Sequence, residues 1–384
     1  MYVSRMTSFD QVPLAPAEWD RLAGGRFFLT WTWLECWWRH YQQDAGNRHE
    51  LYILGVYDDA GRVIGLAPWY LERTTTGAGV VRFLGSGEVC SDHQTLLCPP
   101  GRETEVAGAI AEWLADERPT VSDWLTRQAQ DRWDHLEFDC VDQSDAAMQF
   151  LCDQLAVRNC LLDRQPGLNC WLLDLPSNWE AYLGLLSKNR RAQARKAAAR
   201  VADTEHFTCR EVTSANEFEQ GWSTLVGLHQ RRWQSLGEPG CFASPRFTSF
   251  HHEVAKKLLE RGELRLWWLE HAGRPISAEY QFVCQGTIHG YQSGLDPEAL
   301  DLEPGRMTQV ASKQWAIAHG LQRFDYLRGD EKYKSNWRAE PHPTWNVRVA
   351  APRVAARFAH GVWLAKRNVK SWIKTGLRKA GYAR

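Results

Sequence analysis

The sequence lacks several features that mark whole classes of proteins. Its ten cysteines include no C-x-x-C pair, which argues against a metal site of the structural zinc type. No stretch approaches 18 apolar residues, the length that a membrane-spanning helix needs. The opening segment MYVSRMTSFDQVPLAPAEW has no apolar core of a signal peptide. We therefore expect a cytoplasmic protein with reduced thiols and no metal.

Charge is balanced over the whole chain but not along it. The sequence has 46 basic and 46 acidic residues, so no net charge draws the whole molecule to nucleic acids. Two segments contain no acidic residue. They are SKNRRAQARKAAAR (187–200), with six basic residues, and the segment 351–384, with nine. Any binding of anions therefore depends on local segments and not on the charge of the whole molecule.

Tryptophan and length are what the chain has in abundance. It contains 20 tryptophans, and we expect most to line the core and grooves because each buries a large area. A chain of 384 residues favours two domains. The cluster Pro176-Ser177-Asn178 is the predicted boundary. It gives domains at 1–176 and 177–350, with a basic amphipathic helical tail at 351–384.

The second half contains one continuous α/β pattern. LRLWWLE (264–270), ISAEYQFV (276–283) and TIHGYQSGLD (287–296) are typical of three strands. LEPGRMTQVASKQWAIAHG (302–320) follows with apolar residues at helical spacing. FDYLRGDEKYKSNW (324–337) then begins as a further strand. The pattern predicts an α/β (α+β) fold with a mixed, mostly antiparallel sheet flanked by helices.

The first half repeats part of this pattern. AGRVIGLAPWYL (60–71) resembles AGRPISAEYQFV (272–283), and a similar strand precedes each. HLEFDC (135–140) resembles RFDYLR (323–328), and each follows an Ala-rich helix. We infer two copies of one α/β unit.

Four segments together resemble one known family. The segment 294–337 resembles the signature of the CelD-like (cellulose-biosynthesis-type) acetyltransferases of the GNAT superfamily, which are related to the Fem-type peptidyl transferases. The other three are FFLTWTWLECWWRHY (27–41), FLGSGEVCSDHQTLLCPPG (83–101) and WEAYLGLLSKNRRAQARKAAARV (179–201). The resemblance implies tandem GNAT-like units, the second of which binds acyl-CoA. It also implies transfer of an acetyl or acyl group to an amine.

The start of the helix at 302–320 suits a pyrophosphate. The first N–H groups of a helix have no internal partner and carry partial positive charge. Gly305 lets a ligand approach the backbone and Arg306 adds a charge, although such helix starts are also ordinary turns. Together with the resemblance, this predicts that acetyl-CoA or another acyl-CoA is bound by Gly305, Arg306, Met307 and Thr308.

Acyl transfer to an amine needs a base for the ammonium and an acid for the departing thiolate. Glu279 lies in mid-strand, where a charge is costly, and is the first candidate for the base; strand alternation also permits an outward position. Asp325 ends a strand, where α/β proteins place their chemistry. The resemblance implies that the following Arg-Gly-Asp-x-x-Tyr-Lys passage lines the active cleft. Within it, Tyr333 is the candidate acid and Lys334 the partner of a substrate anion.

The remaining candidates are predicted to bind the acceptor. His289 and Tyr291 alternate on one strand and therefore share a face. The run Ser91-Asp92-His93 cannot form a hydrolase triad, because a triad converges from separate elements. It is either a turn or, as the resemblance implies, a wall of the acceptor cleft. The predicted acceptor-binding residues are Asp92, His93, His289, Tyr291, Arg328 and Asp330.

The two basic segments leave alternatives open. The helix at 187–200 is either a solvated face or a grip on a phosphorylated substrate or RNA. The tail at 351–384 either lies on an anionic membrane surface or docks on the protein with a basic outer face.

We therefore predict a GNAT-type N-acetyltransferase acting on a cell-envelope or exopolysaccharide-related precursor, in the cytoplasm or peripherally on the inner membrane face. One rival is a Fem-type peptidyl transferase that uses aminoacyl-tRNA. The other is a non-catalytic GNAT scaffold at the membrane surface.

Overall fold

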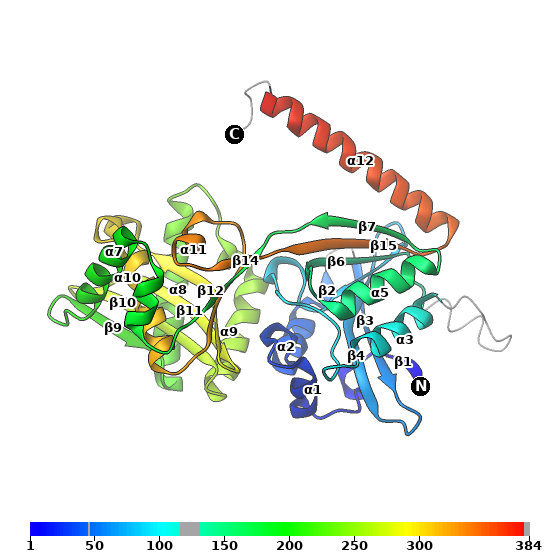
Figure 1. The fold of residues 1–384 in the computed structure, drawn as a ribbon, viewed down its shortest axis with the longest axis horizontal. Helices are drawn as coiled ribbons and strands as arrows, with labels where there is room; N and C mark the ends of the chain where they lie inside the picture. Colours follow the sequence, from blue (N-terminus) through cyan, green and yellow to red (C-terminus); the bar gives the residue numbers. More distant parts are fainter. Residues whose placement is uncertain (45–46, 116–130, 380–384) are drawn as a thin grey trace.

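Two sheets with flanking helices make up the structure (Figure 1). The computed structural model describes residues 1–44, 47–115 and 131–379. The first sheet contains β1 (Tyr2–Met6), β2 (Gln43–Asp44), β3 (Asn47–Tyr57), β4 (Val63–Arg73), β5 (Gly79–Phe83), β6 (His135–Asp142), β7 (Leu161–Pro166) and β15 (Thr344–Ala350). The second sheet contains β8 (Cys170–Asp174), β9 (Phe207–Glu211), β10 (Leu264–His271), β11 (Arg274–Cys284), β12 (Thr287–Leu295), β13 (Arg323–Arg328) and β14 (Glu340–His342).

Helices flank both sheets. They are α1 (Pro16–Ala23), α2 (Trp31–Tyr41), α3 (Glu103–Ala115), α5 (Ala146–Val157), α6 (Trp179–Leu185), α7 (Lys188–Val201), α8 (Ala215–Gln234), α9 (Pro245–Glu260), α10 (Pro304–Ala318), α11 (Lys332–Asn336) and α12 (Val354–Lys379). We call the first sheet with α3 and α5 the first unit, and the second sheet with α6 to α11 the second unit. In the described part of the chain, no helix is both long enough and apolar enough to cross a membrane.

The two units have the same strand order and exchange one strand each. The first sheet runs β1-β3-β4-β5-β6-β15-β7 and the second runs β14-β8-β13-β12-β11-β10-β9. The pairs β5–β6 and β12–β13 are parallel, and the described neighbours around them are antiparallel. Residues 170–174 thus belong to the second sheet and 344–350 to the first. The two sheets therefore cross the predicted boundary at 176 in both directions, because each sheet includes one strand from the other side of it.

An aromatic core joins the units. Phe27 stacks on Phe282 with ring centroids 4.4 Å apart, and Trp33 packs edge-on against the same ring. These side chains are almost fully buried, and burial of each stabilises the fold by roughly 2–3 kcal/mol. The N-terminal segment before α2 is thereby fixed against β11 and β12, which brings residues from both units to one cavity.

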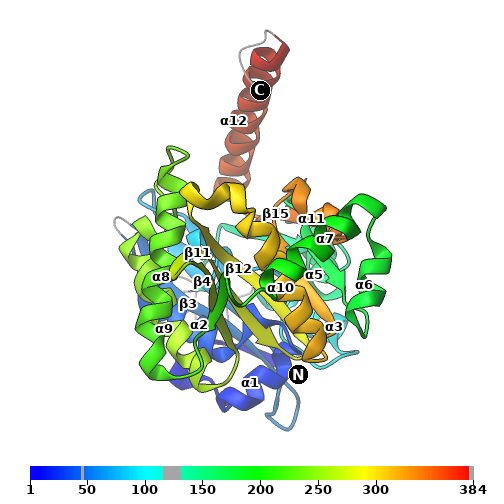
Figure 2. The ribbon, with the colours of Figure 1, turned by 90° about the vertical axis from the view of Figure 1, so that its left-hand side faces the viewer.

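The helix α10 connects the parallel strands β12 and β13 across one face of the second sheet, as Figure 2 shows. The helix α8 covers the opposite face. At Gly294 on β12, an added Cβ would lie 2.6 Å from the backbone nitrogen of His229 on α8. Only glycine permits that approach. The second sheet therefore has two distinct, closely covered faces.

Candidate active site

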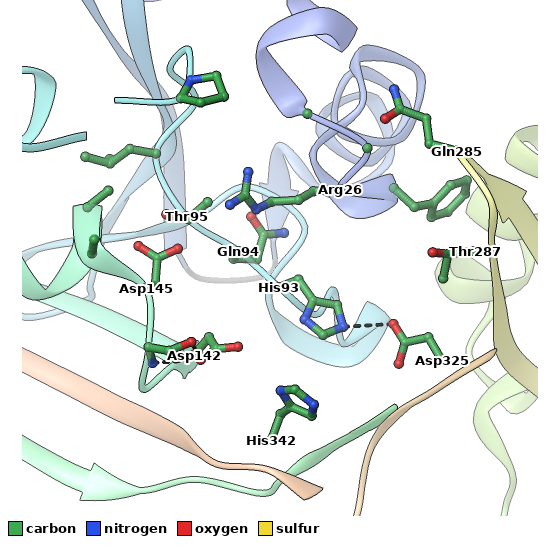
Figure 3. A pocket seen from close by; sticks show the side chains of 18 of the residues that line it. Arg26, His93, Gln94, Thr95, Asp142, Asp145, Gln285, Thr287, Asp325 and His342 are labelled. Carbon is green, nitrogen blue, oxygen red and sulfur yellow. Dashed lines mark hydrogen bonds and ion pairs between the residues drawn. The ribbon is translucent and has the colours of Figure 1, made fainter. Parts of the chain in front are cut away.

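A cavity of about 730 Å³ lies between the two units. Its wall comes from the segment before α2, the loop after β5, the start of α5, and the strands β12 and β13. Figure 3 shows side chains from both units around this space, with His93 reaching across to Asp325. Polar side chains of the wall include Arg26, His93, Gln94, Thr95, Asp142, Asp145, Thr287, His289, Asp325 and His342.

Asp325 joins two histidines in what we call the His-Asp-His trio (His93, Asp325 and His289). The parallel pairing of β12 with β13 places His289 beside Asp325. The Asp325 Oδ2 atom lies 2.8 Å from His93 Nε2 and 3.0 Å from His289 Nδ1. Its Oδ1 atom accepts the backbone N–H of Leu327 at 2.8 Å. The predicted acceptor residues His93 and His289 and the predicted catalytic residue Asp325 thus meet at one cavity wall.

The surroundings of the trio favour a negative charge on Asp325 and a positive charge on His93. Burial would raise the pKa of Asp325, but the charge of His93 and hydrogen bonds from both histidines hold that pKa well below its usual range. Burial would likewise lower the pKa of His93, yet the charge of Asp325 and its hydrogen bond raise that pKa to about 9. At neutral pH, His93 and Asp325 are therefore a buried ion pair.

Three buried polar atoms around this cavity have no hydrogen-bond partner among the described residues: His289 Nε2, Gln94 Oε1 and Thr95 Oγ1. These three residues are at most 5% exposed. A buried polar group without a partner costs about 1–3 kcal/mol, and native proteins contain few of them. Their gathering at one cavity indicates a place for a polar ligand.

Asp92 and Arg328 hold the loop after β5 onto β13. Asp92 forms an ion pair with the Arg328 side chain and accepts the Arg328 backbone N–H at 2.8 Å. The Arg328 Nη2 atom also donates to the Ser91 carbonyl at 2.7 Å. Asp92 is only 1% exposed, so this pair positions His93 and lies behind the cavity.

Glu279 lies on the other face of the second sheet, under α10. Burial raises its pKa to about 7, against smaller opposing effects of Thr308, Lys313 and Arg265. On β13, Phe324 and Tyr326 lie beside the Lys313 ammonium, so Asp325 between them faces the opposite way. The sheet therefore separates the predicted base Glu279 from the trio.

Tyr333 lies on the α10 face with Glu279. Its ring is 6.0 Å from that of Tyr326, and the residue is 44% exposed. Burial of its hydroxyl and the charges of Glu331 and Glu279 raise its pKa. Tyr333 therefore keeps its proton at neutral pH, as an acid must.

Three other predicted site residues are engaged within the protein. Lys334 Nζ is buried and donates to the carbonyls of Leu327, Arg328 and Gly329. Tyr291 shares a face with His289, as predicted; its hydroxyl donates to the Val89 carbonyl at 2.6 Å. Asp330 accepts hydrogen bonds from Asn169 Nδ2 and Trp171 Nε1. These contacts shape the edge of β13 and the turn after it.

The start of α10 offers a phosphate fewer donors than the sequence predicts. The backbone N–H groups of Arg306 and Met307 both donate to the Glu303 carbonyl, and the Arg306 side chain pairs with the Glu303 carboxylate. The Gly305 N–H and the Arg306 guanidinium are the groups available to an anion. Arg200 of α7 donates a hydrogen bond to the Leu302 carbonyl at 2.8 Å and adds a second guanidinium beside the start of α10. These groups would hold one phosphate if it took the place of the Glu303 carboxylate beside Arg306.

Several residues of the cavity wall were not predicted from the sequence. Gln94 and Thr95 directly follow the predicted pair Asp92-His93, so extending that motif would have found them. Arg26, Thr287 and His342 come from three separate elements. Nothing in their local sequence marks them, because only the packing of the two units brings them together.

Comparisons with known proteins agree with this architecture. Residues 188–335 match the family model described as Acetyltransferase (GNAT) domain. The crystal structure of FemX superposes with a TM-score of 0.63 and 10% identity, over 92% of this chain and 99% of that one. A conserved protein of unknown function from Bacteroides thetaiotaomicron gives a TM-score of 0.53 at 8% identity, over 90% and 100%. Curated protein sequences give no match. The two structures show a shared fold.

Proposed function

Since residues 188–335 belong to the acetyltransferase (GNAT) domain family, we propose that this chain is an acyltransferase that moves an acyl group from acyl-CoA to an amine. Bound acyl-CoA would supply an activated thioester carbonyl and a thiolate leaving group. In this proposal, the cavity between the units takes the amine-bearing acceptor. The α10 face takes the acyl donor, with Gly305, Arg306 and Arg200 at a phosphate.

The main support for this proposal is the position of the His289 imidazole. An ammonium has no lone pair, so a base must remove its proton before nitrogen attacks the carbonyl carbon. Because Asp325 Oδ2 accepts from His289 Nδ1, neutral His289 holds its proton there and its lone pair on Nε2. That Nε2 atom is buried at the cavity and has no partner among the described residues. His289 is therefore placed to take the proton, and Asp325 to stabilise the resulting imidazolium.

The strands provide a path between the two faces. β12 and β13 pair only from Thr287↔Arg323 to His289↔Asp325, while β12 continues to Leu295. Beyond His289, the β12 backbone lacks β13 as a ladder partner, and such an edge can pair with an extended, amide-containing chain. The thioester would then lie where the strands separate, next to His289. On the other face, Tyr333 would return a proton to the departing thiolate.

Glu279 remains the alternative base, because a carboxyl group with a pKa of about 7 also suits proton transfer at neutral pH. The test is release of free CoA thiol from acetyl-CoA across a panel of primary amines, for the wild type, His289→Gln and Glu279→Gln. We expect His289→Gln to lower kcat by about 10²–10⁴-fold and to leave acetyl-CoA affinity unchanged. A loss confined to Glu279→Gln would assign the base to the α10 face.

A transferase that uses aminoacyl-tRNA is the main competing function. The sequence evidence for this function was the basic helix α7. Most of the basic side chains of α7 contact other groups of the protein. Arg191 donates to the carbonyl of Leu183 at 2.8 Å, and Arg195 pairs with Glu180 at 2.9 Å. Binding of tRNA together with absence of acetyl-CoA binding would overturn our proposal. The acceptor class implied by the resemblance, a cell-envelope or exopolysaccharide-related precursor, stays a prediction.

A further inference from the structure

The helix α12 leaves the body of the protein. Figures 1 and 2 show it extending well beyond both sheets, from the end of β15. It spans Val354–Lys379, and 26 residues correspond to about 39 Å of helix. A helix this long that stands away from a folded body needs a partner for any apolar stripe it carries.

One face of α12 holds the helix to the first unit. Ala356 and His360 are almost fully buried. The Arg357 side chain donates to the Asn159 carbonyl at 2.6 Å, and Arg367 forms an ion pair with Asp163. These contacts lie at helical spacing along one side, so they fix which side of α12 faces outward.

The opposite face is apolar and exposed. Val354, Phe358 and Val362 recur every four residues and are 85%, 73% and 38% exposed. The exposed Ala365 continues this stripe. Exposed apolar stripes of this kind mark interaction surfaces.

Charge selects the partner. Residues 351–384 contain nine Lys and Arg and no Asp or Glu. In the described part of the helix, the exposed Lys366 lies beside the apolar stripe. An apolar stripe flanked by basic residues matches the boundary between the acyl chains and headgroups of an anionic bilayer. A second α12 would instead bring like charges together.

We infer that α12 docks the protein on an anionic lipid surface. The helix lies in the plane of the interface, with Val354, Phe358 and Val362 inserted among the acyl chains. Lys366, at the border of the stripe, contacts the anionic headgroups. This surface is independent of the active site and holds the transferase at a membrane without spanning it.

The test is flotation of the full chain with vesicles of phosphatidylcholine alone or mixed with phosphatidylglycerol. We expect binding to the mixed vesicles that weakens as salt is raised. Phe358→Glu, which places a carboxylate in the stripe, should lower the partition coefficient at least about tenfold. The matched control is Leu185→Glu on α6, where the exposed leucine (48%) lies outside α12. Circular dichroism of each variant reports whether the fold is retained.

Two results would overturn the inference. One is absence of binding to the mixed vesicles, or equal binding by Phe358→Glu and the wild type. The other is a dimer in light scattering that Phe358→Glu converts to a monomer, which would make the stripe an interface between copies.

Discussion

The two faces of the second sheet each bury a carboxylate, and their surroundings drive the two in opposite directions. On the cavity face, two histidines and a backbone N–H hold Asp325 as an anion. On the α10 face, Glu279 is equally buried, but there desolvation dominates and raises its pKa to about 7. Burial alone therefore does not decide the charge of a carboxylate; the number and distance of its donors do.

This difference separates two chemical roles. A permanent anion cannot accept a proton at neutral pH, so Asp325 orients and stabilises a neighbour, as the acid of a hydrolase triad does. A carboxyl group that titrates near neutrality can exchange protons itself. We therefore assign proton removal on the cavity face to His289 and place Glu279 on the side of the acyl donor.

Removal of the Asp325 charge is the largest change that the comparison predicts. Asp325→Asn removes the charge partner of His93, whose side chain is 21% exposed, and breaking a buried pair in this way costs at most about 3–5 kcal/mol. We expect that loss in the free energy of unfolding, measured by urea denaturation at pH 7. The pKa of His93, followed by NMR, should fall from about 9 to below its ordinary value. Stability and a His93 pKa that both stay unchanged would contradict the ion pair.

Glu279, unlike Asp325, should lower the stability of the protein as pH rises toward neutrality. Its pKa is raised from 4.5 to about 7, so the folded state keeps a proton that the unfolded chain has released. The corresponding stability is fully present below pH 4.5 and is lost as pH rises through 7. Glu279→Gln should remove this pH dependence of the free energy of unfolding, which amounts to at most about 3 kcal/mol between pH 4.5 and pH 7. Denaturation midpoints of the wild type and the variant at several pH values check this. Parallel curves would contradict the raised pKa, because they would mean that Glu279 has the same pKa in the folded and unfolded states.

The smallest expected effect concerns an unpartnered atom of the cavity. Thr95 Oγ1 is buried without a partner among the described residues, so Thr95→Val exchanges a hydroxyl for a methyl of similar size. Without acceptor, the variant should be as stable as the wild type or more stable by about 1 kcal/mol. Thermal unfolding measures this. A loss above about 2 kcal/mol would mean that the hydroxyl is already bonded in the free protein.

Much of the fold could be predicted from the sequence. Hairpins with AGR turns, the helix at 302–320 and the strand that contains Asp325 carry strong local signals. That strand, β13, runs on to Arg328, so the prediction that it ends at Asp325 was wrong. The strand exchange could not be predicted, because Cys170–Asp174 and Thr344–Ala350 are ordinary short strands whose partners are set by long-range packing.

The candidate site was predicted in composition but not in arrangement. His93, His289 and Asp325 were all expected, and alternation correctly placed His289 with Tyr291. Their convergence depends on the register of β12 with β13 and on the loop that Asp92 and Arg328 hold in place. The same alternation places Glu279 on the far face of the sheet. The sequence alone could not decide between an inward and an outward position for this side chain.

Calorimetric titration of acetyl-CoA and desulfo-CoA into the wild type and Arg306→Glu tests the central claim most directly. An acyltransferase of this design binds both ligands with a Kd on the order of micromolar. Arg306→Glu should weaken both by at least about tenfold, because the new carboxylate repels the phosphate. Absence of heat with either ligand in the wild type would contradict acyl transfer from CoA. Equal binding by the variant would move the phosphate away from the start of α10.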